Sequence, residues 1–388
     1  MLRLLAVSNG VGEDLIAARI IESLPRTDIA ITAYPLVGTG AYPPHIPLLE
    51  PRRALPSGGF SLRAGLRGLG ADVGAGIVRL WFEQRRTLVR QRGAADLVMA
   101  VGDTYCLWMA ALASARVAFV STADSVRIAP FGLLGRMRLR RHAQQIFARD
   151  AETAAALAAQ GLPAVALGNV MMDLLRPTGE VFDLPPSAPV VALLPGSRRE
   201  APENAVLLGR AARAIASDRP DVRFLLAHAA GVPASAILQA LAAIGGAAGS
   251  GRQTVAVGPA EIHLTEAFAD ALERATVVVG LAGTANEQAA GLGRPVVAFP
   301  GPGAQFGPAF LSTQHRLLGE ALVPTRTWQE AAGAVIRLLR EPVERERRAA
   351  VGRARMGPAG GAQRIAAAVA DLMARSSAGR APSMIQNT

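Results

Sequence analysis

Residues 191–205 read VALLPGSRREAPENA, so an apolar run stops at a Pro-Gly-Ser turn and continues into two arginines. This order predicts a buried strand, a tight turn and the start of a helix. Gly196 allows close approach of the backbone to a ligand, Ser197 offers a hydroxyl, and Arg198 offers a planar fork that suits phosphate oxygens. Because helix N-termini attract anions, the pattern favours a bound diphosphate. The competing interpretation is an ordinary solvent-exposed turn between a strand and a helix.

A second stretch repeats the pattern. Residues 275–299 read ATVVVGLAGTANEQAAGLGRPVVAF, which again predicts a strand, a glycine turn, a helix and a strand. Gly283 and Thr284 open the helix, and Glu287 and Gln288 follow in its first turn. The Glu287 carboxylate suits the positive end of the helix dipole, but it could also accept hydrogen bonds from ribose hydroxyls. Two such turns in one half of the chain favour a nucleotide-diphosphate site.

Short apolar runs alternate with helical patterns along most of the 388 residues, which predicts two doubly wound α/β domains in tandem. Pro and polar residues are dense over 176–189, which we interpret as the linker. We therefore expect domains at 1–178 and 187–360, a last helix at 361–375 that could pack back on the first domain, and a flexible tail at 376–388. The strands expected on either side of the linker are 2–7, 28–33, 96–101, 116–120 and 144–148, and then 189–194, 222–227, 254–257, 276–279 and 295–298.

The composition limits the function. The formal net charge is +11, but the chain has no lysine and aromatic residues make up only 4%, so we do not expect nucleic-acid binding. One cysteine, Cys106, fits a reducing cytoplasm, and no run approaches the length of a membrane span. The five histidines have no metal-ligand spacing, and we expect neither a metal nor a cofactor.

Two further turns follow strands in the first half. The loop SNGVGEDLIA (8–17) contains Gly10 and Gly12 ahead of a helix, with Glu13 and Asp14 in its first turn. It fits either a flexible loop at a ligand cleft or a plain helix start. In LVMAVGDTYCLWMA (97–110), Asp103 follows a strand, where it is a candidate general base or a simple helix cap.

Arginines and apolar residues mix over 60–92 and 127–141, and the apolar residues of the first stretch have helical spacing. A basic, apolar surface suits anionic lipid headgroups, whereas a core helix with a solvated basic face is the alternative. The residues expected to contact a membrane are Leu66, Arg67, Trp81, Phe82, Arg85, Phe131, Leu134 and Arg138.

The motifs LLPGSRRE, GLAGTANEQAAGLGRPVVAF, SNGVGEDLIAARI, ALGNVMMD (166–173) and PGPGAQFGPAFLSTQHRLLG (300–319) resemble lipid-A-disaccharide synthase and its related proteins. The resemblance implies a GT-B-type fold, with two Rossmann-like domains facing a central cleft. It also implies inverting, metal-independent transfer of a sugar from a UDP-sugar to a lipid-linked acceptor, on the inner face of the cytoplasmic membrane. The sequence keeps only the first aspartate of the family's DxPDFN-like stretch, which leaves the acceptor open.

Carried over onto this chain, the resemblance implies a base and a set of donor contacts. Asp103 would be the base, and Glu287 would bind the ribose. The donor would also contact Ser197, Arg198, Gly283, Thr284, Asn286, Gln288, Gln305 and Gln314. A UDP-sugar 2-epimerase and a non-catalytic binder of nucleotide sugars or lipids are the alternative functions.

Overall fold

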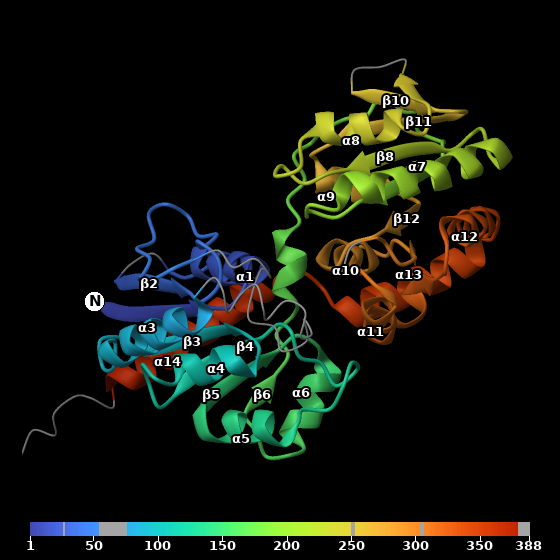
Figure 1. The fold of residues 1–388 in the computed structure, drawn as a ribbon. Coiled ribbons are helices and arrows are strands. Elements are labelled where there is room, and N and C mark those ends of the chain that lie inside the picture. The colour runs from blue at the N-terminus through green and yellow to red at the C-terminus, as the bar shows by residue number, and fades with distance from the viewer. Residues whose placement is uncertain (26–27, 54–75, 250–252, 303–305, 379–388) are drawn as a thin grey trace, which may run out of the picture. The chain divides into compact units, whose positions relative to one another are not determined.

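The computed structural model describes residues 1–388 except 26–27, 54–75, 250–252, 303–305 and 379–388. The chain divides into two compact units. Unit 1 is made of residues 1–174 and 359–388, and unit 2 is made of residues 175–358. Both units have a sheet covered by helices, which confirms the predicted α/β fold class with Rossmann-like domains (Figure 1).

The described part of unit 1 contains a parallel sheet in the order β2-β1-β3-β4-β5-β6. Its elements are β1 (Leu2–Ser8), α1 (Val11–Glu22), β2 (Ile29–Pro35), α3 (Ile77–Arg90), β3 (Leu97–Gly102), α4 (Thr104–Ala110), β4 (Val117–Ser121), α5 (Leu133–His142), β5 (Ala143–Ala148), α6 (Ala151–Ala158), β6 (Ala164–Val165), the 3₁₀ helix η1 (Val170–Leu174) and α14 (Gly361–Ala378).

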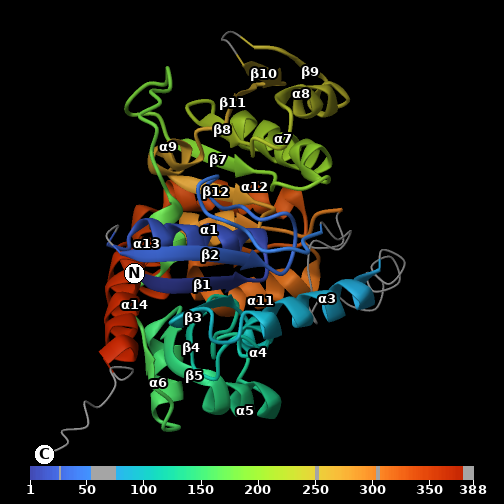
Figure 2. The same ribbon diagram turned by 90° about the vertical axis from the view of Figure 1, so that its left-hand side faces the viewer.

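Alternating strand residues give the sheet of unit 1 two apolar faces. Leu4 and Met99 join a core with α1 and α14, whereas Leu5 and Val98 join a core with α3, α4, α5 and α6. The helix α14 therefore completes unit 1, although it is the last element of the chain (Figure 2). It continues to Ala378, three residues beyond its predicted end.

The described part of unit 2 has a sheet in the order β14-β13-β12-β7-β8-β11-β10-β9. The strand β10 pairs antiparallel with both neighbours, and the other pairs are parallel. Its elements are β7 (Val190–Leu194), α7 (Ala201–Asp218), β8 (Arg223–Ala227), α8 (Ala234–Ala242), β9 (Gly246–Ala248), β10 (Thr254–Val257), β11 (Ala260–Thr265), α9 (Phe268–Arg274), β12 (Val277–Gly280), α10 (Thr284–Gly291), β13 (Val296–Ala298), α11 (Pro308–Leu318), the 3₁₀ helix η2 (Gly319–Ala321), β14 (Leu322–Pro324), α12 (Trp328–Arg340) and α13 (Pro342–Met356).

The stretch predicted as a linker belongs to unit 2, which begins at Leu175. The buried Asp270 of α9 explains this, because its carboxylate accepts hydrogen bonds from the amides of Thr178 (2.9 Å) and Gly179 (2.8 Å). Arg274 donates to the carbonyls of Pro185 (2.8 Å) and Ala188 (3.1 Å). Side chains of α9 thus hold a segment that composition alone marks as irregular.

A pair of helical glycines tests how closely the helices of unit 2 pack. A methyl group at the buried Gly352 of α13 would overlap the carbonyl of Ala290 in α10, whereas one at the exposed Gly333 of α12 would have no neighbour within 4 Å. We expect Gly352→Ala to lower the free energy of unfolding by about 1–3 kcal/mol. The control Gly333→Ala should raise it by about 0.5–1 kcal/mol, because alanine is the better helix former. Urea unfolding measures the free energies of both variants. Equal effects of the two substitutions would contradict the close contact between Gly352 and Ala290.

Candidate functional site

Two glycine turns lie side by side at the carboxyl edge of the sheet in unit 2. The strands β7 and β12 are parallel neighbours whose last residues, Leu194 and Gly280, are directly paired. The amide of Leu281 donates to the carbonyl of Leu194 at 2.9 Å, so the turn after β12 starts against the turn after β7. Gly196 has a φ of +89°, and a Cβ there would lie 3.2 Å from the Leu281 carbonyl oxygen. This position therefore needs glycine.

The predicted donor-binding residues divide into an outer and an inner group. Ser197, Arg198 and Thr284 are exposed, and Gly283 and Glu287 are half-buried. These residues lie on the two turns or in the first turn of α10, next to the N-termini of α7 and α10. The inner group is buried and consists of Asn286, Gln288 and Gln314. Gln305 lies outside the described residues.

The inner group holds the turn after β12 in place. The Asn286 amide nitrogen donates to the Gly280 carbonyl (3.1 Å) and to Gln314 Oε1 (3.0 Å). Gln314 in turn donates to the carbonyls of Gly283 (2.9 Å) and Ala282 (3.2 Å). A Cβ at Gly280 would overlap Asn286 Oδ1, so a glycine there makes room for the amide.

The sequence analysis missed a third buried amide at this edge. Asn204 of α7 donates to the Pro195 carbonyl at 2.9 Å, so it supports the turn after β7 as Asn286 supports the turn after β12. Its Oδ1 lies 2.7 Å from the place of a Cβ at Gly301, just beyond β13. The available signal was an asparagine at an apolar position of a helical pattern, where it needs a hydrogen-bonding partner.

In unit 1, Asp103 caps the helix α4. Its Oδ1 accepts hydrogen bonds from the amides of Tyr105 and Cys106, both at 3.0 Å, and from Asn9 Nδ2 at 2.9 Å. Asn9 follows β1, and the end of that strand pairs with β3. Gly102 has a φ of +151°, and a Cβ there would overlap Asn9 Oδ1. Asp103 is therefore the N-cap of α4, and its side chain is half-buried at the end of β3.

The candidate residues of the first loop, Gly10, Gly12, Glu13 and Asp14, differ in burial. Gly12 is exposed, whereas the Glu13 side chain folds over Gly10 so closely that a Cβ at Gly10 would overlap its carboxylate. Burial is the main cause that raises the pKa of Glu13, and the negative charges of Asp103 and Asp14 raise it further. The carboxylates of Glu13 and Asp103 thus lie near each other in unit 1.

Asp14 lies in the first turn of α1, as the alternative of a plain helix start implies, and the helix turns its side chain into the interior of unit 1. Asp14 is fully buried, and its carboxylate accepts hydrogen bonds from Ser8 Oγ (2.5 Å) and the Ala41 amide (3.0 Å). The hydroxyls of Ser8 and Tyr42 lie 2.6 Å apart. Burial raises the pKa of Asp14 to about 6, against the lowering effect of Ser8 and Ala41. Asp14 anchors the segment after β2.

Of the residues expected at a membrane, those that the structure describes lie on α3 and α5 of unit 1 or just before α5. Arg85 stacks over the rings of Trp81 (4.7 Å) and Trp108 (5.0 Å), and Arg138 stacks over Trp108 at 5.3 Å. We call the resulting patch the arginine-aromatic surface. It consists of Trp81, Phe82, Arg85, Trp108, Leu133, Leu134, Met137 and Arg138.

Four of its apolar side chains are exposed, among them Phe82 (53%) and Leu134 (68%), and its two tryptophans are half-buried. Phe131 is half-buried and packs against the core. Leu66 and Arg67 lie outside the described residues. No described helix combines the length and the apolar character that crossing a membrane requires.

Among the described residues, no three or more histidine, cysteine or acidic side chains are grouped so that they could hold a metal ion. The single cysteine, Cys106, is buried in unit 1, and burial raises the pKa of its thiol. The polar groups at the strand ends of both units are therefore hydroxyls, guanidinium groups, amides and carboxylates.

A comparison with protein-family models finds no match, and a search of curated proteins finds none either. Solved structures do resemble the chain. A protein from Listeria monocytogenes described as a UDP-N-acetylglucosamine 2-epimerase has a TM-score of 0.60 at 15% identity, with 97% of each chain covered. The S. aureus MnaA–UDP structure has a TM-score of 0.57 at 14% identity, over 94% of this chain and 95% of that one.

The calicheamicin glycosyltransferase CalG4 has a TM-score of 0.56 at 16% identity, over 97% of this chain and 99% of its own. These similarities show that the chain has a GT-B-type fold, as the sequence predicted. At these identities they establish the fold alone.

The Asp14 anchor predicts a pH dependence in unit 1. The native pKa of about 6 lies above the ordinary value of 3.8, so the native state holds the proton more tightly. The stabilisation is fully present below pH 3.8 and is lost as the pH rises through about 6. We expect the free energy of unfolding of the wild type, minus that of Asp14→Asn, to fall by up to about 3 kcal/mol between pH 4 and pH 7.

Urea unfolding in a Trp328→Phe background measures this difference, because Trp81 and Trp108 of unit 1 are then the fluorescent reporters. Parallel pH profiles for the wild type and Asp14→Asn would contradict the assignment.

Proposed function

We propose that the protein is an inverting, metal-independent glycosyltransferase that moves a sugar, of the N-acetylglucosamine type, from a UDP-sugar to a lipid-linked acceptor. The observation that carries this proposal is the pairing of Leu194 with Gly280, because it brings two glycine turns and two helix N-termini to one edge of unit 2. Helix N-termini and oriented backbone amides are common binding sites for phosphate groups. The solved MnaA structure of the same fold contains UDP, which supports this choice of nucleotide.

The outer group supplies the donor contacts in this proposal. Arg198 and Ser197 bind the diphosphate, Thr284 and the backbone of Gly283 contact it from the other turn, and Glu287 accepts hydrogen bonds from the ribose. Gln288 and Gln305 complete the set carried over from the family resemblance. Asn286 and Gln314 act as positioning residues, because their buried amides are bonded to the backbone of the turn.

Asp103 serves as the base. It accepts the proton of the acceptor hydroxyl while the hydroxyl oxygen bonds to the anomeric carbon, and the bond from that carbon to the diphosphate breaks on the opposite side. The leaving UDP carries the negative charge, which Arg198 and the helix N-termini stabilise in place of a metal. The amide donors on Asp103 Oδ1 hold its carboxylate in one orientation.

The acceptor side involves the arginine-aromatic surface. Exposed Phe82, Leu134 and Met137 provide apolar area, and the arginines of α5 provide positive charge without an acidic residue in the helix. This combination suits the surface of an anionic bilayer, where a lipid-linked acceptor resides. We therefore place the protein peripherally on the cytoplasmic face of the membrane.

A UDP-sugar 2-epimerase is the second candidate, because a protein described as a UDP-N-acetylglucosamine 2-epimerase has the same fold over 97% of the chain. The two functions differ in whether an acceptor is consumed. Incubation with UDP-N-acetylglucosamine alone yields a 2-epimer only from the epimerase, and formation of that product would replace the transferase proposal.

Two variants separate donor binding from the chemical step. We expect Arg198→Gln to weaken UDP binding about 10- to 100-fold, since a hydrogen bond to a charged group contributes about 1.5–3 kcal/mol. The neighbouring exposed Arg199→Gln is the matched control and should bind UDP normally. Asp103→Asn should bind UDP normally but lose about 10²- to 10⁴-fold in turnover with a lipid extract as acceptor. Calorimetry and a transfer assay measure these effects, and near-normal turnover of Asp103→Asn would refute its role.

The membrane proposal has a separate test by vesicle flotation. The double variant Phe82→Ser/Leu134→Ser should lose at least tenfold in binding to anionic vesicles, because it removes two large exposed apolar side chains. Val343→Ser is the control, since Val343 is 84% exposed on α13 of unit 2. Binding should also fall with salt. Equal flotation of both variants, or no wild-type binding to anionic vesicles, would contradict the proposal.

A further inference from the structure

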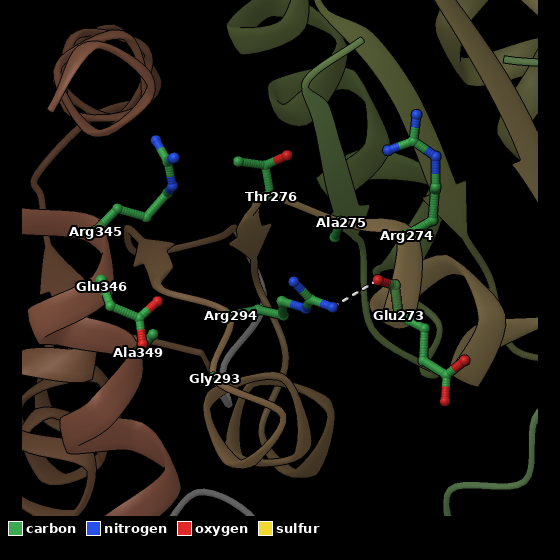
Figure 3. A pocket seen from close by; sticks show the side chains of 9 residues that line it. All are labelled: Glu273, Arg274, Ala275, Thr276, Gly293, Arg294, Arg345, Glu346 and Ala349. Carbon is green, nitrogen blue, oxygen red and sulfur yellow. Dashed lines mark hydrogen bonds between the residues drawn. The ribbon is translucent and has the colours of Figure 1, made fainter. Parts of the chain in front are cut away.

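Unit 2 has a polar hollow at the edge of its sheet opposite to the glycine turns. It has a volume of about 400 Å³ and lies beside Thr276 and Arg294, which precede the strands β12 and β13. Its lining comes from the end of α9, the turn before β13 and the first half of α13 (Figure 3). The proposed donor site uses the carboxyl ends of the strands, so this hollow at their amino ends is a different place.

The charged residues of the hollow are three arginines, Arg274, Arg294 and Arg345, and two glutamates, Glu273 and Glu346. Glu346 already forms an ion pair with Arg353, which lies outside the lining. The lining therefore carries an excess of positive charge. A buried or half-buried cation without a counter-charge is costly, so the hollow favours an anion.

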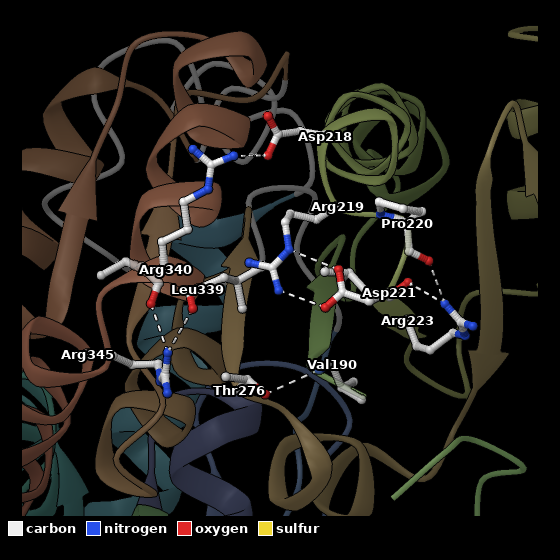
Figure 4. A network of polar contacts seen from close by, with 12 residues as sticks. Val190, Asp218, Arg219, Pro220, Asp221, Arg223, Thr276, Leu339, Arg340 and Arg345 are labelled. Atoms are coloured by element: carbon white, nitrogen blue, oxygen red, sulfur yellow. Dashed lines mark hydrogen bonds and ion pairs between the residues drawn. The ribbon is translucent and has the colours of Figure 1, made fainter. Parts of the chain in front are cut away.

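The arginines of the hollow differ from the arginines around it. Near the same edge, Arg340 forms an ion pair with Asp218 at 2.6 Å, and Arg219 forms a bidentate ion pair with Asp221 (Figure 4). By contrast, Arg345 donates to the carbonyls of Leu338 (2.9 Å) and Leu339 (3.5 Å). Within the described residues, none of the three lining arginines has a carboxylate partner within 4.0 Å.

Arg294 is the central residue of the group. It is half-buried, its Nη2 donates to the Glu273 carbonyl at 2.6 Å, and its buried Nε has no acceptor among the described residues. Loss of hydration lowers the pKa of Arg294; the negative charges of Glu273 and Glu346 oppose this, and the charge of Arg353 adds to the lowering. The hollow therefore has an unsatisfied buried donor in its wall.

We propose that this hollow binds a small phosphate ester that also carries hydroxyl groups, of the size of a sugar phosphate. Arg294 and Arg345 bind the phosphate, because guanidinium groups fit its oxygens. The exposed Glu273 carboxylate accepts hydrogen bonds from the hydroxyls, and the volume is that of a small-molecule site, larger than a bare phosphate needs. The ligand bridges α9, β13 and α13 of unit 2.

Calorimetry on the full chain tests the proposal with inorganic phosphate and glucose 6-phosphate as probes. An Arg198→Gln background weakens binding at the glycine turns, so that the hollow dominates the titration. We expect glucose 6-phosphate to bind more tightly than phosphate, and Arg294→Gln and Arg345→Gln each to weaken it at least tenfold. Arg340→Gln is the matched control, because Arg340 is paired with the carboxylate of Asp218. The affinity of this variant for glucose 6-phosphate should stay within twofold of that of the parent protein.

Thermal unfolding gives a second readout that a purely structural role would not produce. Arg294→Gln should retain its unfolding temperature without a ligand but lose the increase that glucose 6-phosphate causes. The proposal is overturned if glucose 6-phosphate does not bind, if Arg294→Gln binds it normally, or if Arg340→Gln weakens it equally. Equal affinity for inorganic phosphate and glucose 6-phosphate would show that the hollow does not recognise the hydroxyl groups, which overturns that part of the proposal.

Discussion

The candidate site of unit 2 depends on the close packing of a buried amide against a glycine at the end of a strand. Asn286 lies against Gly280, where any side chain would displace it, and it connects that strand end to Gln314 of α11. Because Gln314 also donates to the carbonyls of Ala282 and Gly283, these buried hydrogen bonds restrain the turn. A rigid turn loses little entropy when it binds a diphosphate, so the inner amides prepare the outer residues.

Unit 1 uses the same arrangement at a different strand. Asn9 occupies the space that Gly102 leaves open, and it donates to the carboxylate of Asp103. In both units an asparagine amide thus stabilises the backbone or side chain that follows a central strand. The constraint explains why glycines end these strands, since a Cβ there would overlap the asparagine side chain.

The sequence predicted the α/β class and most central strands, because β7, β12 and other buried strands are continuous apolar runs. The predicted strands did not include β6, β9, β11 or β14. The second domain was expected to begin at residue 187, whereas unit 2 begins at Leu175, since the contacts of Asp270 are not visible in a local pattern. The exposed turn residues Ser197, Arg198 and Thr284 were predicted from the residue types in their two motifs. The pairing of Asn286 with Gln314 across 28 residues, and the inward orientation of Asp14, arise only from tertiary packing.

The return of α14 to unit 1 has a consequence for synthesis on the ribosome. Unit 2 is contiguous in sequence, so it can fold as soon as it has emerged. The part of the unit 1 sheet that Ile365, Val369 and Met373 cover stays open until α14 is made. The first half of the nascent protein therefore carries exposed apolar surface throughout translation of unit 2, and such surface favours association with chaperones.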